Sequence, residues 1–336
     1  MVGEHRDSIR INGQSFPVLE RMRVAGRSLL VIEQLGHFSR PTYRVVEPGL
    51  THEVRCLQIL PYSKQTASRI RLLSKISKPQ ANLPSIVSSH RNADQVYLLT
   101  QWIDGPTLRE YHRQCQSGRE PWPSALVTIN LMLGLAHGFR LLHDRLGVVH
   151  GDLHPANLVL CRHTKRLVPI DFGSAFPVER SVMTSKTHQA ARNYAAPEVL
   201  DQERIGFQSD QFSAMAVCYQ MLTGEVPYDG LGGRAALAST ADRGVDELAI
   251  ALTPPSQQLR HSASIPVDSK SKLDALISRG LAFTAEERFA TTRQFIDALR
   301  EVRQLLAAEA AGPSGLNQWL LRRISEAAGW LRIDKR

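Results

Sequence analysis

The stretch that decides the fold runs His150-Gly151-Asp152-Leu153-His154-Pro155-Ala156-Asn157, and fourteen residues after its asparagine comes Asp171-Phe172-Gly173. Between the two motifs lie short apolar runs at 158–161 and 167–170, separated by the polar turn 163–165. Two apolar runs flanking a turn predict a β-hairpin, which would return Asp171 to the side of Asn157. The sequence therefore predicts that oxygen-bearing side chains from two loops converge.

Three of these side chains suit a site for phosphate and metal. The Asp152 carboxylate can accept a proton from an attacking hydroxyl group. The Asn157 amide oxygen and the Asp171 carboxylate are hard oxygen ligands of the kind that Mg²⁺ prefers. We therefore expect all three residues to act in phosphoryl transfer, with Asn157 and Asp171 holding the metal.

Together these motifs resemble the catalytic and metal-binding loops of the eukaryotic-type protein kinase family, whose usual form is His-Arg-Asp-Leu-(x)3-Asn followed by Asp-Phe-Gly. Later motifs keep the family order. Ala196-Pro197-Glu198 matches the end of the activation segment, Asp210 the aspartate that binds the catalytic-loop backbone, and Arg288 the arginine that pairs with the motif's glutamate. The resemblance covers residues 28–305 and implies a bilobal α+β fold, with a small β-rich N-lobe and a larger helical C-lobe.

Hydrophobic periodicity predicts the same two lobes. The expected strands are 29–35, 42–46, 54–60 and 95–100, and the expected helices are 64–77, 124–146 and 209–222. We divide the chain into a polar, basic and loosely ordered leader (1–27), an N-lobe (28–103), a C-lobe (104–307) and a C-terminal part (308–336).

The C-terminal part is expected to hold a separate basic amphipathic helix at 316–333. Pro313 and Gly315 break the chain before it, and Trp319 and Trp330 lie at its ends. Such a helix can dock on its own domain, on a partner, or on an anionic membrane surface, and these alternatives stay open.

Composition narrows the classes of function. The chain has 336 residues, 43% of them hydrophobic, which suffices for one large core or two lobes. A charged N-terminus and the lack of an uninterrupted apolar run of about 18 residues predict a cytoplasmic protein. The four cysteines show no CxxC spacing, which argues against zinc and against a disulfide framework. The net charge of +9 is scattered, and without a nucleic-acid-binding motif we expect no nucleic-acid partner.

The strand that carries the family's phosphate-binding lysine departs from the usual pattern. Where the family has Val-Ala-Ile-Lys, this chain has Arg55-Cys56-Leu57-Gln58. Gln58 therefore stands at the lysine position, and residues 61–83, which include the following helix, contain no acidic side chain. The ion pair between that lysine and a helix glutamate cannot form.

The glycine-rich loop is also reduced. Gly36 is present, but Phe38 and Pro41 occupy the next two glycine positions. When the loop is aligned from the strand that follows it, Arg40 falls at the third glycine, which resembles the with-no-lysine kinases. We expect Arg40 to replace the lysine; Arg44 is the second candidate, and a solvated Arg40 is the alternative.

The resemblance also implies the remaining nucleotide contacts. Adenine would lie between Cys56 above and Val159 below, with Thr100 as gatekeeper and with hinge hydrogen bonds from Gln101 through Ile103.

The catalytic and activation segments carry three further changes. His154 takes the place of the lysine that steadies the γ-phosphate in serine/threonine kinases, and Ala191 that of a threonine. Gly151 replaces the arginine that binds a phosphorylated activation loop, so we expect no such switch.

Three functions follow from these patterns. The first is an ATP- and Mg²⁺-dependent protein kinase of serine/threonine type, with atypical phosphate anchoring and an unknown protein substrate. The second is a pseudokinase that binds or regulates. The third is a small-molecule phosphotransferase of the aminoglycoside or choline kind, which His-Gly-Asp-Leu-His-Pro also resembles. We expect the first, because Ala196-Pro197-Glu198, Asp210 and Arg288 are features of the protein kinases.

Overall fold

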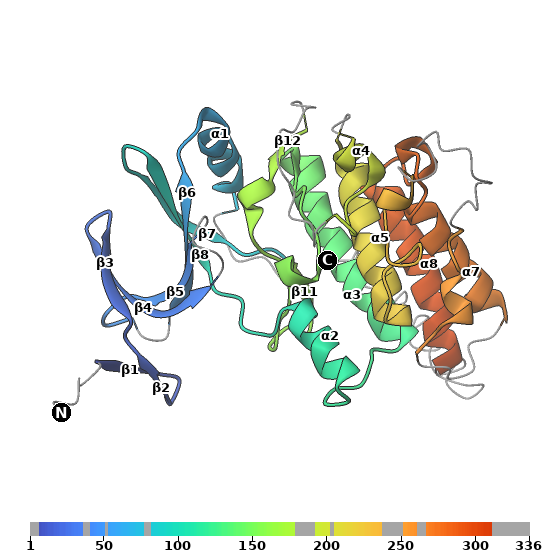
Figure 1. Cartoon of the computed structure of the whole chain (residues 1–336), viewed down its shortest axis with the longest axis horizontal. Coiled ribbons are helices and arrows are strands. Elements are labelled where there is room, and N and C mark those ends of the chain that lie inside the picture. Colours follow the sequence, from blue (N-terminus) through green and yellow to red (C-terminus); the bar gives the residue numbers. More distant parts are fainter. Residues whose placement is uncertain are drawn as a thin grey trace, which may run out of the picture.

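The computed structural model describes residues 7–35, 41–50, 53–76, 82–178, 192–201, 205–236, 251–260 and 267–310. In Figure 1 a β-rich N-lobe lies to the left and a larger helical C-lobe to the right. The predicted bilobal α+β fold is confirmed.

A six-stranded antiparallel sheet forms the N-lobe. In spatial order its strands are β3 (Glu20–Val24), β4 (Arg27–Leu35), β5 (Thr42–Val46), β6 (Val54–Pro61), β8 (Gln95–Gln101) and β7 (Ile86–Arg91). One face buries a core of Leu29, Val31, Val45, Leu57 and Leu99. Because side chains alternate along a strand, Cys56 and Gln58 lie on the other face.

Helix α1 (Lys64–Leu73) begins where the sequence predicts, at the N-cap Ser63, whose hydroxyl accepts from the Thr66 N–H. It ends at Leu73, before the predicted residue 77. The Ser74 hydroxyl donates to the carbonyl of Ile70 at 2.7 Å, a side-chain bond that competes with continued helix.

The leader expected at residues 1–27 is wrong where the structure describes it. β1 (Ser8–Ile11) and β2 (Gln14–Pro17) pair as a hairpin around Asn12-Gly13, and Ala25-Gly26 turns β3 into β4. Both turn pairs have positive φ at both residues, which suits a two-residue hairpin loop because its twist matches that of the strands. The Asn-Gly pair was a visible signal for this hairpin.

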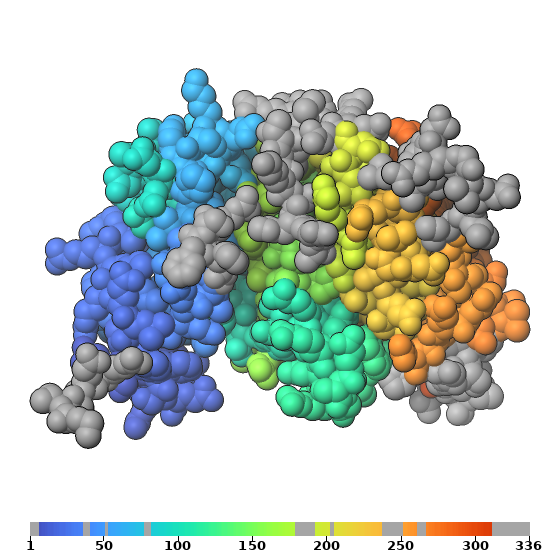
Figure 2. All heavy atoms as spheres, viewed as in Figure 1, coloured from blue at the N-terminus to red at the C-terminus, as the bar shows by residue number. Residues whose placement is uncertain are grey.

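The β1–β2 hairpin packs on the face of the sheet that carries Cys56. Ile11 is buried against Ile32 and Val46. Val46 is two residues from Arg44, which lies opposite Cys56, so these side chains share one face. The N-terminal strands form the dark blue surface at the lower left of Figure 2.

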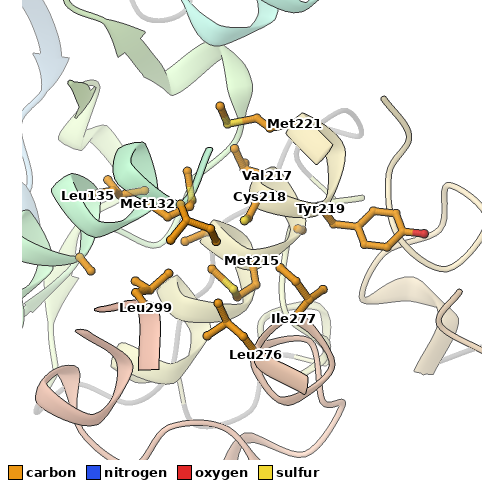
Figure 3. Packing of buried hydrophobic residues seen from close by; sticks show 14 of the residues in the cluster. Met132, Leu135, Met215, Val217, Cys218, Tyr219, Met221, Leu276, Ile277 and Leu299 are labelled. Atoms are coloured by element: carbon orange, nitrogen blue, oxygen red, sulfur yellow. The ribbon is translucent and has the colours of Figure 1, made fainter. Parts of the chain in front are cut away.

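Helices α3, α5, α7 and α8 build the C-lobe core. The helices of this lobe are α2 (Leu108–Gln116), α3 (Ala125–Phe139) with a π-helical extension η1 (Arg140–Arg145), α4 (Pro197–Leu200), α5 (Phe207–Thr223), α7 (Val267–Gly280) and α8 (Thr292–Ala310). Figure 3 shows Met132 and Leu135 of α3 meeting Met215 of α5, Leu276 of α7 and Leu299 of α8. The helices predicted at 124–146 and 209–222 are thereby confirmed.

One helical run in the described part of the chain, Ala125–Arg145, is long and apolar enough to cross a membrane by length and composition. In the structure this run is α3 with η1, and α3 packs against α5 and α8 in the C-lobe core. Burial inside the lobe accounts for its apolar composition.

Short elements between α3 and α4 position the candidate site. They are β9 (Val148–Val149), the 3₁₀ turn η2 (Pro155–Asn157), β10 (Leu158–Leu160), β11 (Leu167–Pro169), the 3₁₀ turn η3 (Phe172–Ser174) and β12 (Phe176–Pro177). β10 and β11 form the predicted hairpin. Gly36, Phe38 and Arg40, as well as Ala191 and the C-terminal segment 311–336, lie outside the described residues.

Candidate active site

Asp210, in the first turn of α5, fixes the loop that carries Asp152. Its Oδ1 accepts from the Gly151 N–H at 2.9 Å and its Oδ2 from the His150 N–H at 2.8 Å. His143 Nε2 lies 2.8 Å from the same Oδ2. Burial raises the pKa of Asp210, but the hydrogen bond and charge of His143, the charge of His150 and the Gly151 hydrogen bond together outweigh it and hold that pKa below the ordinary value. The predicted backbone contact of Asp210 is confirmed.

Position 151 requires glycine for two reasons, its backbone conformation and the close approach of a neighbouring side chain. Its φ is +74°, and an added Cβ would lie 2.8 Å from the Phe176 ring. Only glycine avoids both the strain and the clash. The departure from the family's arginine therefore leaves room for β12 beside the loop.

The β10–β11 hairpin brings the two metal-ligand candidates together. The Ile170 N–H donates to the Asn157 carbonyl at 2.8 Å, so Asp171 follows directly beside Asn157. The Asn157 Nδ2 donates to the carbonyl of Asp152 at 3.0 Å, which leaves Oδ1 as the atom that faces a ligand. Asp152, Asn157 and Asp171 therefore converge, as the hairpin interpretation predicts.

Asp171 adopts a left-handed backbone, with φ 58° and ψ 72°. This conformation costs about 1 kcal/mol or more in a residue other than glycine. Its Oδ1 accepts from the Gly173 N–H at 3.0 Å and from the Gln58 Nε2 at 3.1 Å. These bonds stabilise the strained residue and fix the direction of its carboxylate.

Gln58, Cys56 and Thr100 lie together on the cleft face of the sheet. Gln58 is 7% exposed and reaches Asp171 from β6. Cys56 lies opposite Thr100 in the β6–β8 register. Burial is the main cause that raises the pKa of Cys56 to about 12; the Thr100 hydrogen bond lowers it and the Asp171 charge raises it. The thiol therefore stays neutral, as an apolar contact for adenine would require.

The hinge and floor candidates surround the same cleft. The Gln101 N–H donates to the Ser85 carbonyl at 2.9 Å, and its side chain turns to Ser85 as well. The Gln101 N–H is therefore taken, so the Gln101 carbonyl and the N–H of the half-buried Ile103 are the backbone groups with hinge spacing. Val159 on β10 is 5% exposed and bridges to Thr107, below the sheet.

His154 lies next to Asp152, with Nε2 at 3.7 Å from Oδ1. Its Nδ1 accepts from the Ala156 N–H at 3.3 Å, which places the proton of the neutral ring on Nε2. Burial is the main cause that lowers the pKa of His154, and the nearby Asp152 opposes it. His154 is therefore a neutral donor near pH 7 and does not supply the charge of the family's lysine.

Arg44, the second candidate for the missing cation, is held at the hinge end of the cleft. Its guanidinium lies 5.0 Å from the Phe16 ring and 4.7 Å from the Trp102 ring, and Nη1 is 3.4 Å from Glu33. It lies opposite Cys56, one side-chain position further along the face than Gln58.

Sequence reasoning missed Arg69, on the inner side of α1. Its Nη1 donates to the carbonyl oxygens of Gly173 and of Phe172, the latter at 3.4 Å, and its Nη2 to the Thr66 hydroxyl at 3.1 Å. A signal was present, because position 69 lies one turn from Thr66 and beside the buried Ile70. A basic residue on the inner face of a helix that contains no acidic residue indicates a hydrogen-bond acceptor in another part of the chain.

The predicted pairing of Glu198 with Arg288 is confirmed. Arg288 Nη1 and Nη2 bind the two carboxylate oxygens at 2.7 Å and 2.9 Å, and the pair is buried. It ties α4, after the activation segment, to the loop before α8.

The site fits Mg²⁺. Asn157 Oδ1 and the second oxygen of Asp171 are side-chain oxygen ligands on loops already fixed by hydrogen bonds, and Mg²⁺ in proteins usually takes one or two such ligands, with water and phosphate completing the shell. Within the described ranges no group of three or more His, Cys, Asp and Glu side chains offers a separate metal site.

A β-rich lobe joined to a helical lobe, with Asp152, Asn157 and Asp171 converging between them, is the arrangement of a phosphotransferase domain. The family profile "Protein kinase domain" matches residues 54–298. The chain therefore belongs to the protein kinase domain family.

Relatives and a solved structure agree with this assignment. The chain is 26% identical over 239 residues to a probable serine/threonine-protein kinase PknB of Bifidobacterium longum, covering 64% of this chain and 30% of that protein. It is 31% identical over 224 residues to serine/threonine-protein kinase PknB of Mycobacterium leprae, covering 63% and 32%. The match thus spans about a third of each relative. The kinase PK-1 of Cydia pomonella granulovirus shares the fold, with a TM-score of 0.63 at 18% identity over 80% of this chain and 93% of that one.

Proposed function

We propose that this chain is an ATP- and Mg²⁺-dependent protein kinase that phosphorylates serine or threonine and anchors the nucleotide phosphates without the family's strand lysine. The observation that carries the proposal is the convergence of Asp152, Asn157 and Asp171 on two loops that backbone and side-chain hydrogen bonds hold in place. The serine/threonine kinases among the relatives support the choice of acceptor.

In this mechanism Asp152 accepts the proton of the substrate hydroxyl. His154, neutral and with Nε2 3.7 Å from Asp152 Oδ1, lies beside the carboxylate and adds no charge that would lower its basicity. Asn157 and Asp171 would hold Mg²⁺, which when bound neutralises charge on the phosphate oxygens. Asp210 keeps the loop in place through the Gly151 and His150 amides.

The phosphate anchoring differs from the usual arrangement. Gln58 already donates one amide hydrogen to Asp171 and has one more for a phosphate oxygen, but it is neutral. A cation must then come from elsewhere, because electrostatic stabilisation is the main resource of this reaction. Arg40, the expected replacement, lies outside the described residues, whereas Arg44 is engaged by Phe16, Trp102 and Glu33.

The test is phosphotransfer by the purified full chain with Mg²⁺ and labelled ATP, using casein-like and basic protein acceptors and an autophosphorylation control. We expect labelled phosphoserine or phosphothreonine, and loss of label in Asp152→Asn and in Asp171→Ala. Label that persists in Asp152→Asn would contradict the assignment. If Asp171→Ala leaves the nucleotide-induced thermal shift unchanged while Gln58→Ala abolishes it, the metal site is misassigned.

A pseudokinase is the second candidate, and the neutral Gln58 is the observation that favours it. The family's lysine–glutamate pair is replaced by an amide and a helix without acids, so nucleotide binding without transfer is chemically reasonable. Binding of Mg-ATP in a thermal-shift assay, combined with no label on any acceptor, would decide for it.

A further inference from the structure

We propose that Arg69 is a positioning residue that holds the metal-binding segment Asp171-Phe172-Gly173 against α1, in place of the lysine–glutamate pair by which the family links helix and site. This inference rests on the proposed function for its catalytic meaning. In the family's pair the helix supplies the carboxylate, whereas here the helix supplies the cation. That cation bonds to backbone carbonyls, and no carboxylate on α1 takes part.

The guanidinium is held before it reaches the loop. Arg69 Nη2 donates to the Thr66 hydroxyl at 3.1 Å, and that hydroxyl is itself 2.9 Å from the Ser63 hydroxyl at the N-cap of α1. Arg69 is half-buried, one turn from Thr66 on the inner side of the helix. Because its planar fork is pre-oriented, less side-chain entropy is lost when it bonds the loop.

The contact lies one residue from the metal ligand. Arg69 Nη1 donates to the Gly173 carbonyl, while the Gly173 N–H donates to Asp171 Oδ1 at 3.0 Å. Gln58 approaches the same Oδ1 from the sheet at 3.1 Å. The carboxylate direction is therefore set from two sides, by Gln58 directly and by Arg69 through Gly173.

The neighbouring packing supports the same role. Phe172 is buried in the cluster that contains Ile70 and Leu73 of α1, and its ring lies 5.1 Å from the His150 ring. Packing alone fixes the position of the ring, but it gives no direction to the left-handed backbone at Asp171. Hydrogen bonds from a charged donor supply that direction, since they are stronger than neutral ones.

Arg69 also supplies part of the positive charge that the site lacks without the family's strand lysine. Gln58 is neutral, and His154 is neutral near pH 7 because its pKa is lowered. Arg69 places a positive charge directly beside the metal-binding segment. A fixed charge near developing negative charge contributes most where water is excluded.

The experiment compares Arg69→Met and Arg69→Lys with Arg71→Met in the full chain. Arg71 lies on the same helix and is exposed, so it controls for loss of charge and for helix propensity. Two readouts are measured: hydrogen exchange of peptides covering residues 171–175, and the Mg²⁺ concentration for half-maximal nucleotide binding by thermal shift. Neither readout requires phosphotransfer, so the test stands even if the chain proves inactive as a kinase.

In Arg69→Met we expect exchange in 171–175 and the half-maximal Mg²⁺ concentration each to rise about tenfold, the size that one charge-assisted hydrogen bond supports. Arg69→Lys should lie between this variant and the parent, and Arg71→Met should match the parent. Equal values for Arg69→Met and Arg71→Met overturn the proposal. So does faster exchange spread over the whole N-lobe with an unchanged Mg²⁺ requirement, which would mean a purely structural role.

A charge swap gives a second, independent test. Arg69→Glu alone should raise the Mg²⁺ requirement more than Arg69→Met, because a carboxylate repels the Phe172 and Gly173 carbonyls. Adding Gln58→Lys restores the family's pair, and we expect the Mg²⁺ requirement to return to within about threefold of the parent, as expected for coupled neighbours. A double variant no better than Arg69→Glu would contradict the linkage.

Discussion

Replacing Arg288 by methionine should destabilise the C-lobe strongly, because every N–H of its guanidinium has a partner. Nε donates to the Ala282 carbonyl at 2.8 Å, Nη1 to Glu198 at 2.7 Å and the Gln208 carbonyl at 3.1 Å, and Nη2 to Glu198 at 2.9 Å and the Phe283 carbonyl at 3.0 Å. The Arg288 side chain is 0% exposed and that of Glu198 8%. Methionine fills a similar volume but leaves the Glu198 carboxylate without its cation and removes the guanidinium donors to three backbone carbonyls.

The cost follows from that count. Removing one partner of a buried ion pair destabilises a protein by about 3–5 kcal/mol, because the other charge stays buried without compensation. The hydrogen bond that Ser209 donates to Glu198 at 2.7 Å remains, so we expect the middle of this range, about 4 kcal/mol. At about 2 °C per kcal/mol for a domain of this size, Tm should fall by about 8 °C.

The assay is urea unfolding at pH 7, with Arg293→Met as the matched control. Arg293 is 89% exposed and lies 3.7 Å from Asp297 one helical turn away, a type of pair that contributes about 0.5 kcal/mol or less. Glu198→Gln and the double variant complete a cycle, in which the double loss should be smaller than the sum of the single losses.

Two results would refute this reasoning. The first is an Arg288→Met protein whose unfolding free energy lies within about 1 kcal/mol of the Arg293→Met control. The second is additive losses in the Glu198 and Arg288 variants, which would show that the two side chains do not act as a pair.

Three further predictions concern other regions. Burial lowers the pKa of His112 from 6.5 to about 4, so the unfolded chain binds the proton more readily and stability falls as the pH drops below about 6.5. The unfolding free energy measured in urea should therefore be about 2 kcal/mol lower at pH 5 than at pH 7 because of this residue, and His112→Gln should remove that difference. Gly105→Ala would place a Cβ 2.1 Å from a backbone oxygen of β10 and should cost about 3 kcal/mol, whereas Gly118→Ala, with open space around it, should cost about 1 kcal/mol in the same assay. Phe16→Ala removes the ring beneath Arg44 and should make limited proteolysis within residues 8–24 at least severalfold faster; unchanged cleavage would show that the hairpin is held by other contacts.

The sequence predicts those parts of the site that depend on residue spacing within one strand or one hairpin. Strand alternation alone is enough to place Gln58 and Cys56 on the same face of the sheet, and spacing alone brings Asp171 beside Asn157. The buried partner of Arg288 also follows from motif order, because the family resemblance pairs this arginine with the glutamate of Ala196-Pro197-Glu198.

What the sequence did not reveal depends on contacts between distant segments. Arg69 acquires its role only where α1 meets the metal-binding segment, 104 residues further on at Gly173. Its helix position was predictable, whereas its partner was not. Local signals were overlooked in two other places: Asn12-Gly13 marks the β1–β2 turn, and Thr107 with Glu110 forms the capping box that begins α2.

The strand β3 has a consequence for self-association. In β4, residues 29 to 32 are all buried, and pairing with β3 covers the outer backbone edge of this apolar strand. The edge on this side of the sheet is instead β3, where Glu20, Arg21 and Arg23 are exposed and discourage another strand from pairing. A fragment that starts at the family match, at Val54, would lack β1 to β5 and expose β6 as a new edge. We therefore expect the strand β3 to protect the apolar β4 from edge-to-edge pairing with another chain.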